Sequence, residues 1–242
     1  GYTEDSRLTL QIEGGVIAEG TAAAPIYFTS DAAAPQNGDW SMLRVYSPSG
    51  TARFNYCVFE FAQHGLNVWN ATISIANSAF RWNNWEGVYF ESYCQVTMEN
   101  IQIYENGYNG LAAEQFNTIT MDNAEVWRNG TNGVHVDAST LEIRRSRVHA
   151  NKANGLSVDN NGTLKAFGVA INDNISAGIG QGEGTNTVEI GNLSFSNNGS
   201  EINGAYTETA TSYTAPASIS LGFTPSQSNA LNYIPGDQAL DN

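Results

Sequence analysis

The stretch from Asn83 to Gly178 decides the fold, because it contains one short motif five times at nearly constant spacing. The motif is Asn-x-x-x-Gly followed by an aliphatic residue, and it reads NNWEGV at 83–88, NGYNGL at 106–111, NGTNGV at 129–134, NKANGL at 151–156 and NISAGI at 174–179. The successive glycines are 23, 23, 22 and 23 residues apart. A fixed period of this length indicates a solenoid, a propeller or another array of stacked repeats.

Each repeat contains three short runs in which apolar and polar residues alternate, as at 88–90, 96–98 and 101–103. Alternation with a period of two is typical of strands. Three strands per coil of 22–23 residues predict an all-β fold, a single-stranded parallel β-helix built as a three-sheet solenoid of about nine or ten coils. We expect a right-handed coil, because connections between successive parallel strands are right-handed in the great majority of proteins.

The repeated asparagines are Asn83, Asn106, Asn129, Asn151 and Asn174, and the series continues at Asn197 without its glycine. At the strand spacing of roughly 4.8 Å, stacked asparagine side chains can bond one another and the backbone of their turn. We therefore predict a buried asparagine ladder in preference to an exposed polar stripe, with the left-handed backbone that asparagine tolerates. The glycine that follows is expected to provide the tight backbone at the start of the first strand.

These repeats resemble those of the right-handed parallel β-helix superfamily, which includes the pectate-lyase-like proteins. A second stretch, with Gly20-Thr21, the run 25–30 and Gly38-Asp39-Trp40, resembles the opening coils of β-helix domains in large secreted bacterial surface proteins. The resemblance covers roughly residues 7–202 and implies the fold. It leaves the activity open, because the superfamily contains lyases, hydrolases, epimerases, adhesins and inert spacers.

The composition points to an extracellular or cell-surface protein, and the resemblance implies a bacterial one. The chain has 24 acidic and 10 basic residues, a formal net charge of −14, and only 14% charged residues. Such a surface repels nucleic acid and anionic lipid. No stretch is long and apolar enough to insert into a membrane. We expect neither nucleic acid nor membrane as a partner.

The chain is expected to divide into a β-helix at 1–202 and a C-terminal cap with a linker-like end at 203–242, where the repeat fades and Ala, Ser and Thr dominate. Its further partners would be other domains of a longer parent chain. Cys57 and Cys94 fall at different edges of their coils, which favours two unpaired cysteines over one disulfide.

Four carboxylates each follow a repeat glycine by four residues: Glu91, Glu114, Asp137 and Asp159. They are expected to point outward at the edge of the first sheet, roughly 4.8 Å apart. Like charges at this spacing disfavour joint ionisation, which a bound cation relieves. A solvated acidic edge is the favoured interpretation, and weak Ca²⁺ binding centred on Asp137 and Asp159 is the alternative. No other cofactor is expected.

Aromatic residues cluster on neighbouring coils and are the best candidates for a binding surface: Trp82, Trp85, Tyr89, Tyr104, Tyr108 and Trp127. Flat exposed rings can stack on sugar rings and lose little conformational entropy when they bind. Aromatic side chains also shield the backbone and stabilise stacked strands, so a purely structural role is the alternative for each residue.

His135 lies two residues after Gly133 and is predicted to point outward beside Asp137. A histidine beside a carboxylate can act as a general base. His135, Asp137 and Glu114 are therefore the candidates for catalysis, although a plain surface histidine is favoured.

A column of threonines marks the second run of each coil: Thr72, Thr118, Thr140, Thr163 and Thr187, with Gln95 interrupting it. Regular threonine arrays on flat solenoids can order water, as in ice-binding solenoids. The neighbouring outward positions include Glu142, Lys165 and Glu189, and these charges disfavour a flat hydroxyl face. Threonine is also simply a good strand residue.

The sequence lacks the paired aspartates with His-Gly and Arg-x-Lys of polygalacturonases and the Asp-Pro-His motif of alginate epimerases. We therefore predict a non-catalytic segment of a secreted or cell-surface protein, a rigid spacer with a carbohydrate-binding or adhesive surface for a polysaccharide or cell-surface glycan. One alternative is a polysaccharide lyase or hydrolase acting on the outer face of the first sheet. Another is a purely structural stalk or an ice-binding solenoid.

Overall fold

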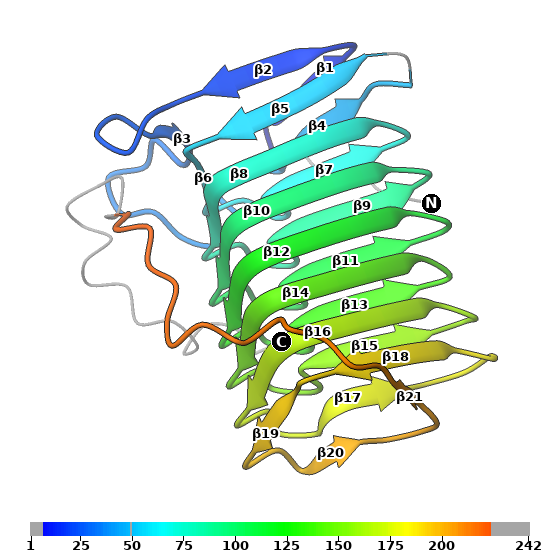
Figure 1. Ribbon diagram of the computed structural model, residues 1–242. Helices are drawn as coiled ribbons and strands as arrows, with labels where there is room; N and C mark the ends of the chain where they lie inside the picture. The colour runs from blue at the N-terminus through cyan, green and yellow to red at the C-terminus, as the bar shows by residue number, and fades with distance from the viewer. Residues whose placement is uncertain (1–6, 49, 224–242) are drawn as a thin grey trace.

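The computed structural model describes residues 7–48 and 50–223, which form a parallel β-helix with its strands stacked along one axis (Figure 1). The chain alternates between a nine-stranded and a twelve-stranded sheet, and neighbouring strands pair in parallel. The predicted all-β solenoid is confirmed. It has about seven regular turns, fewer than the nine or ten expected, because the coils at both ends are short and irregular.

The first sheet contains, in spatial order, β1 (Thr9–Glu13), β4 (Met42–Tyr46), β7 (Leu66–Trp69), β9 (Val88–Ser92), β11 (Leu111–Glu114), β13 (Val134–Asp137), β15 (Leu156–Asp159), β17 (Ala177–Gln181) and β20 (Ser200–Ile202). The second sheet contains β2 (Val16–Glu19), β5 (Thr51–Asn55), β8 (Thr72–Arg81), β10 (Gln95–Tyr104), β12 (Thr118–Trp127), β14 (Thr140–His149), β16 (Thr163–Asn172), β18 (Thr187–Gly191) and β21 (Thr207–Glu208), joined at its side by β3 (Ile26–Phe28), β6 (Cys57–Glu60) and β19 (Ser194–Ser196).

The expectation of three separate sheets is corrected. In the central coils the second and third runs form one ten-residue strand, as in β10 and β12. A single residue in the left-handed region bends each strand in the middle, for example Asn100 with φ of 56° and Asn123 with φ of 53°. One such residue turns the chain without ending the strand, so the second sheet is continuous but folded into two faces.

The core is made of inward side chains that pair in register from coil to coil. Leu66, Val88, Leu111, Val134 and Leu156 form one column, as predicted, and each is at most 1% exposed. Full burial of a side chain of this size contributes about 1.5–3 kcal/mol relative to exposure. Because each coil buries its apolar face only against its neighbours, this column holds the coils together.

The predicted asparagine ladder is confirmed. Asn83, Asn106, Asn129, Asn151 and Asn174 are at most 2% exposed. Each Nδ2 donates to the Oδ1 of the next asparagine at 2.9–3.0 Å, and the main-chain N–H donates to that same oxygen. Each amide also donates to a main-chain carbonyl of the preceding coil, so the ladder satisfies backbone groups that would otherwise be buried without partners.

Two details of the ladder prediction are wrong. The left-handed residue is the one before each asparagine, such as Glu105 or Arg128. The last member is Asn198, whose Oδ1 accepts from Asn174, while Asn197 is exposed and bonds Asp173. The final coil is one residue longer than the period, and this extra residue shifts the ladder position.

The repeat glycines are required by the ladder and not by an unusual backbone angle. A Cβ on Gly110 would lie 2.7 Å from Nδ2 of Asn129 and 2.6 Å from the carbonyl oxygen of Gly133. A Cβ on Gly133 or Gly155 would lie 2.6–2.9 Å from the equivalent two groups of the next coil. The asparagine amide of one coil therefore occupies the space that a side chain would need on the glycine of the coil before it.

A second ladder, not predicted from the sequence, follows the bend of the second sheet. The Nδ2 atoms of Asn77, Asn100 and Asn123 each donate to the Oδ1 of the preceding member, starting with Asn55, at 2.9, 3.0 and 2.6 Å. Asparagine suits this position because it tolerates the left-handed backbone of the bend. This outer ladder is half-buried, in contrast to the inner one.

Both cysteines are free, as predicted, and both are buried. Burial raises the pKa of the Cys57 thiol to about 11 and also raises the pKa of Cys94. The thiolate is the reactive form, so both side chains act as small apolar groups in the core.

After β21 the chain turns back and crosses the outer face of the second sheet, as the orange segment in Figure 1 shows. We call residues 209–223 the C-terminal strap. Gly168, in the bend of β16, has φ of 63°, and a Cβ there would lie 2.5 Å from the Tyr213 carbonyl carbon. The glycine at this bend therefore allows the strap backbone at Tyr213 to pack closely against the sheet. Residues 224–242 of the predicted linker-like end lie outside the described residues.

Outward side chains of the second sheet hold the strap through its backbone. Nε2 of Gln102 donates to the Ile219 carbonyl at 2.9 Å, and the Ile219 N–H donates to Oε2 of Glu125 at 3.2 Å. Arg147 donates to the Ala217 carbonyl. Gln102, Glu125 and Arg147 occupy one column on β10, β12 and β14, so the strap ties three coils together.

We predict that Asn129→Ala lowers the free energy of unfolding by about 1–3 kcal/mol, because it leaves buried groups of Asn106 and Ile103 without partners. Chemical denaturation followed by circular dichroism measures this. The matched control is Asn84→Ala, which replaces the exposed asparagine directly after the ladder residue Asn83. This substitution is expected to change the free energy of unfolding by less than about 0.5 kcal/mol. Equal effects of the two substitutions would contradict the ladder's role.

We predict that acid weakens the strap through Glu125. Its burial opposes ionisation, but hydrogen bonds from His149 and the Ile219 N–H and the charge of Arg147 outweigh burial, so the pKa of Glu125 is lowered. A lowered carboxyl pKa contributes stability above the unfolded-state value, and this contribution is lost as pH falls through the folded-state pKa.

Melting temperatures of the wild type and Glu125→Gln, compared between about pH 7 and pH 3, test this prediction. The wild type should be the more stable protein at neutral pH, and the difference should shrink as the pH falls. A difference that does not change with pH would mean that the charge of Glu125 does not hold the strap.

Candidate functional site

The outer face of the first sheet brings together most of the polar candidates. One outward column runs through Asn67, Tyr89, Ala112, His135 and Ser157 on β7, β9, β11, β13 and β15. A second lies two residues further along the strands and includes Glu114, Asp137 and Asp159, which pair in register. Three members of the predicted carboxylate column therefore pair in register, and they lie beside Tyr89 and His135.

Each carboxylate of that column has a partner of its own. Glu91 forms an ion pair with Arg44 at 2.9 Å, and Glu114 accepts a hydrogen bond from the Tyr89 hydroxyl at 2.8 Å. Asp137 accepts from Nδ2 of Asn160 at 2.7 Å, and Asp159 accepts from Oγ of Ser157 at 3.1 Å. These contacts relieve the repulsion that the spacing alone would impose.

The histidine on this face lies nearer to a different carboxylate from the one expected. Nδ1 of His135 is 3.5 Å from Oδ2 of Asp159 on the next coil, and the structure gives it no contact with Asp137. The Tyr89 hydroxyl has a raised pKa, because the side chain is partly buried and donates to the Glu114 carboxylate. Tyr89 therefore stays protonated and acts as a hydrogen-bond donor.

A second histidine, His64, joins this face and was not among the predicted site residues. It is only 9% exposed, and its Nδ1 lies 3.0 Å from Oε2 of Glu86, at an angle unsuited to a hydrogen bond. Its ring packs edge-on against Trp85 at 5.0 Å and lies 5.9 Å from the Tyr89 ring. His64 directly precedes Gly65, which packs against the next coil as the repeat glycines do, and Glu86 directly precedes the repeat glycine Gly87. This shared position is the sequence signal for the contact between His64 and Glu86.

The six predicted aromatic residues do not form one surface. On the second sheet the rings of Tyr104 and Trp127 stack face to face at 4.2 Å, and Trp127 is parallel to His149 at 6.0 Å. Trp82 is 8% exposed and its Nε1–H donates to Glu105. The faces of these rings are used within the protein, which is the shielding role that the sequence left open.

The other three aromatic residues are more accessible. Trp85 and Tyr108 are 47% and 51% exposed, and they occupy the same point in the turn of successive coils, where the Tyr108 N–H donates to the Trp85 carbonyl. Tyr89 is half-buried next to them, on the first strand after the turn. These three residues are the more accessible part of the predicted binding surface, and the buried His64 ring packs against Trp85.

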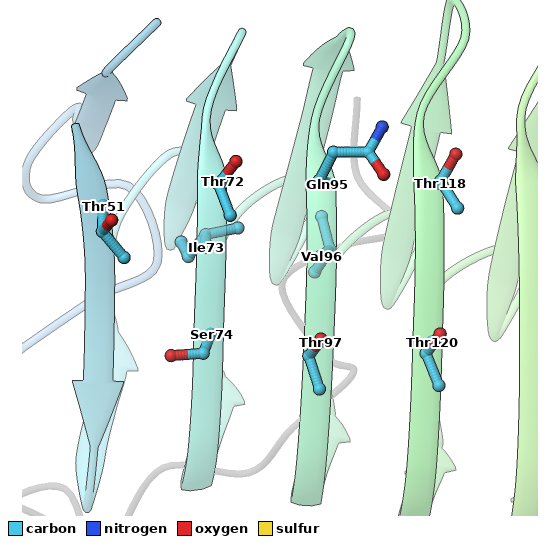
Figure 2. Close-up of a pocket in the computed structure, with 9 residues that line it drawn as sticks. All are labelled: Thr51, Thr72, Ile73, Ser74, Gln95, Val96, Thr97, Thr118 and Thr120. Carbon is cyan, nitrogen blue, oxygen red and sulfur yellow. The ribbon is translucent and has the colours of Figure 1, made fainter. Parts of the chain in front are cut away.

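The threonine column is confirmed on the outer face of the second sheet. Figure 2 shows Thr51, Thr72, Gln95 and Thr118 side by side on neighbouring strands, with a second row of Ser74, Thr97 and Thr120 two residues further along. These side chains line a shallow hollow. Further along, Glu142 and Lys165 take the place of the second-row hydroxyls, as expected.

Among the described residues, no group of three or more histidine, cysteine or acidic side chains is arranged to hold a metal ion. No helix in the described part of the chain is long and apolar enough to cross a membrane. The Ca²⁺ hypothesis therefore depends on the carboxylate column alone.

If Ca²⁺ binds at Asp137 and Asp159, we predict a dissociation constant of about 10⁻⁴–10⁻³ M, because waters or carbonyls must complete the shell and Asn160 and Ser157 must be displaced. Isothermal titration with millimolar CaCl₂ measures this, with Asp137→Asn as the variant that should abolish the heat. Identical titrations of the wild type and Asp137→Asn would mean that the column is a solvated acidic edge.

The comparisons with known proteins agree with this architecture. A family model described as a right-handed β-helix region matches residues 43–209, which confirms the expected hand. A pectate lyase, Pel9A, has a similar structure, with a TM-score of 0.53 and 18% identity over 77% of this chain and 60% of the lyase. No curated protein sequence matches.

Two further solved structures match, one of them with a TM-score above 0.5. The tailspike protein 2 of Escherichia coli O157:H7 bacteriophage CAB120 has a TM-score of 0.57 and 16% identity, over 77% of this chain and 31% of the tailspike. The periplasmic alginate epimerase AlgG has a TM-score of 0.48 and 14% identity, over 74% of this chain and 58% of the epimerase. The chain thus spans less than two thirds of each of these proteins, and identities this low are informative about the fold alone.

Proposed function

The chain belongs to the right-handed β-helix family, and on that basis we propose that it is a non-catalytic, carbohydrate-binding segment of an extracellular or cell-surface protein. Its ligand would be a polysaccharide or cell-surface glycan. The site would be the turn that carries Trp85 and Tyr108 together with the adjoining outer face of the first sheet. The stacked coils would act as a rigid support for that surface.

The observation that carries this proposal is the exposure of two large aromatic side chains at one turn position on successive coils. Trp85 and Tyr108 are each about half exposed, although their apolar surface would be buried at lower free energy. Such rings are suited to stack on the apolar faces of sugar rings. The Tyr89 hydroxyl, His64 and Glu86 next to them are polar groups that could orient a sugar.

The local pairing of the carboxylates favours binding over cleavage. Glu91 and Glu114 are occupied by Arg44 and Tyr89, and His135 lies next to Asp159 instead of Asp137. A pair of carboxyl groups free to act as acid and base would be needed for a hydrolase. The named activity of one similar structure, a pectate lyase, supports polysaccharide as the class of ligand and nothing finer.

Cleavage remains the second candidate, because Tyr89, Glu114, His135 and Asp159 all lie on one outer face and form two polar pairs there. Product formation on acidic or neutral polysaccharides, lost in Asp159→Asn, would establish an enzyme and contradict the non-catalytic proposal. We expect no product from the wild type.

We predict that a glycan array will find a carbohydrate ligand, and that Trp85→Ala and Tyr108→Ala will each weaken its binding about tenfold through loss of ring stacking. Tyr206→Ala removes a ring of similar exposure, 48%, at the C-terminal end of the solenoid and should leave binding unchanged. Trp127→Ala tests the stacked column on the second sheet. Binding that is lost in Trp127→Ala but kept in Trp85→Ala would contradict the proposed position of the site.

A further inference from the structure

A second candidate surface lies on a different face of the solenoid, where the threonine hollow of Figure 2 continues along the axis. A neighbouring hollow is lined by Phe116, Asn117, Thr118, Ala138, Ser139, Thr140, Asn160 and Asn161. The two hollows share Thr118 and therefore adjoin one another, and together they extend from Thr51 on β5 to the loop after β15. We call this the hydroxyl trough.

The hydroxyl trough is uncharged. The described side chains that line its two hollows are hydroxyls, amides and apolar groups that include the Phe116 ring, and none of them carries a charge. The whole chain, in contrast, has a net charge of −14. A polyanion would be repelled by the surrounding field, whereas an uncharged ligand with many hydroxyl groups would find donors and acceptors along the trough.

A ridge of aromatic side chains borders the trough, at the ends of consecutive strands of the first sheet. Tyr93 and Phe116 follow β9 and β11, and their rings stack at 5.6 Å with an interplanar angle of 27°. Tyr46 and Trp69, which end β4 and β7, stack at 4.7 Å with the same angle. Phe116 lines the second hollow, and Tyr93 adjoins the hollow through its stacking on the Phe116 ring.

The aromatic residues of the ridge reduce the stability of the folded protein in two ways. Tyr93 is 59% and Phe116 is 62% exposed, so large apolar surfaces contact water. Both residues also have left-handed backbones, with φ of 51° and 69°, which is unusual for bulky side chains. Asn70 has the same backbone, with φ of 47°, at the equivalent point one coil earlier, so asparagine would suit the turn better.

We propose that the hydroxyl trough and its aromatic ridge bind an uncharged oligosaccharide that lies along the solenoid axis. The exposed sides of the Tyr93 and Phe116 rings, which these residues do not use to stack on each other, contact the sugars, and the hydroxyls and amides of Thr118, Gln95 and their neighbours bond the sugar hydroxyls. This site is separate from the proposed site at Trp85 and Tyr108, and it does not depend on that proposal. The trough is too polar for a lipid and lacks the charge that would select an acidic glycan.

Isothermal titration with cellohexaose, mannohexaose and xylohexaose, and with oligogalacturonate as the charged comparison, tests the proposal. We expect at least one uncharged hexaose to bind more tightly than oligogalacturonate. Tyr93→Asn and Phe116→Asn should each weaken that binding about tenfold. Because asparagine suits this backbone, both variants should fold with unchanged or raised melting temperatures.

The hydroxyl contribution has its own matched pair of variants. Thr118→Val keeps the shape of the side chain that joins the two hollows but removes its hydroxyl, and it should weaken binding several-fold. Thr187→Val makes the same change in the same column outside the trough and should have no effect.

The results separate this site from the first. Binding of an uncharged hexaose that is lost in Trp85→Ala and Tyr108→Ala but kept in Tyr93→Asn and Phe116→Asn would place the ligand on the first face and overturn this inference. Binding of none of the uncharged hexaoses, or tighter binding of oligogalacturonate, would overturn it as well. Loss confined to the Tyr93 and Phe116 variants would support it whether or not the first site exists.

Discussion

The structure depends on the hydrogen bond between asparagine amides of successive coils. In this bond the amide of Asn106 donates to the Oδ1 of Asn129, and the same oxygen also accepts from the Asn106 main-chain N–H. The bond connects one coil to the next at a single point of the period. The repeat glycine is its steric counterpart, because Gly110 leaves the space that the Asn129 amide fills. The Asn-x-x-x-Gly motif and the stacking of the coils therefore both follow from this one contact.

The ladder fixes the register of each coil, and the register in turn determines how the surface side chains are arranged. With a constant register, side chains at equivalent positions lie in columns about one strand spacing apart. Every surface feature discussed above is such a column: Trp85 with Tyr108, Glu114 with Asp137, and Thr72 with Gln95 and Thr118. A solenoid of this kind can carry different chemistry on each face, and it is suited to long polymers that contact several coils at once.

The sequence was sufficient to predict the parts of the structure that follow the period. The inner ladder, the core column and the outward carboxylates could all be predicted because each occurs once per coil. The outer ladder of Asn55, Asn77, Asn100 and Asn123 has the same spacing and could equally have been predicted from the sequence. The shift of the last ladder position to Asn198 could not be predicted from the sequence, because one extra residue in the last coil changes the ladder position without changing the pattern.

Features outside the period required the structure. The strap contacts Gln102 and Glu125 from 117 and 94 residues away, with no repeated motif to indicate it. The bend that joins the second and third runs interrupts the alternation and resembles the end of a strand. The split of the aromatic candidates into stacked and exposed groups depends on side-chain packing, which the spacing of Trp127 and Trp85 does not reveal.

The central claim is that the ladder holds the coils in register, and native-state hydrogen exchange tests it most directly. The main-chain N–H groups of Asn83, Asn106, Asn129 and Asn151 donate to buried Oδ1 atoms, although they lie in turns. If the account is correct, these turn amides exchange as slowly as core-strand amides such as that of Val126, through opening of the whole solenoid. If they exchange as fast as the N–H of exposed turn residues such as Asn161, the ladder does not hold the coils together.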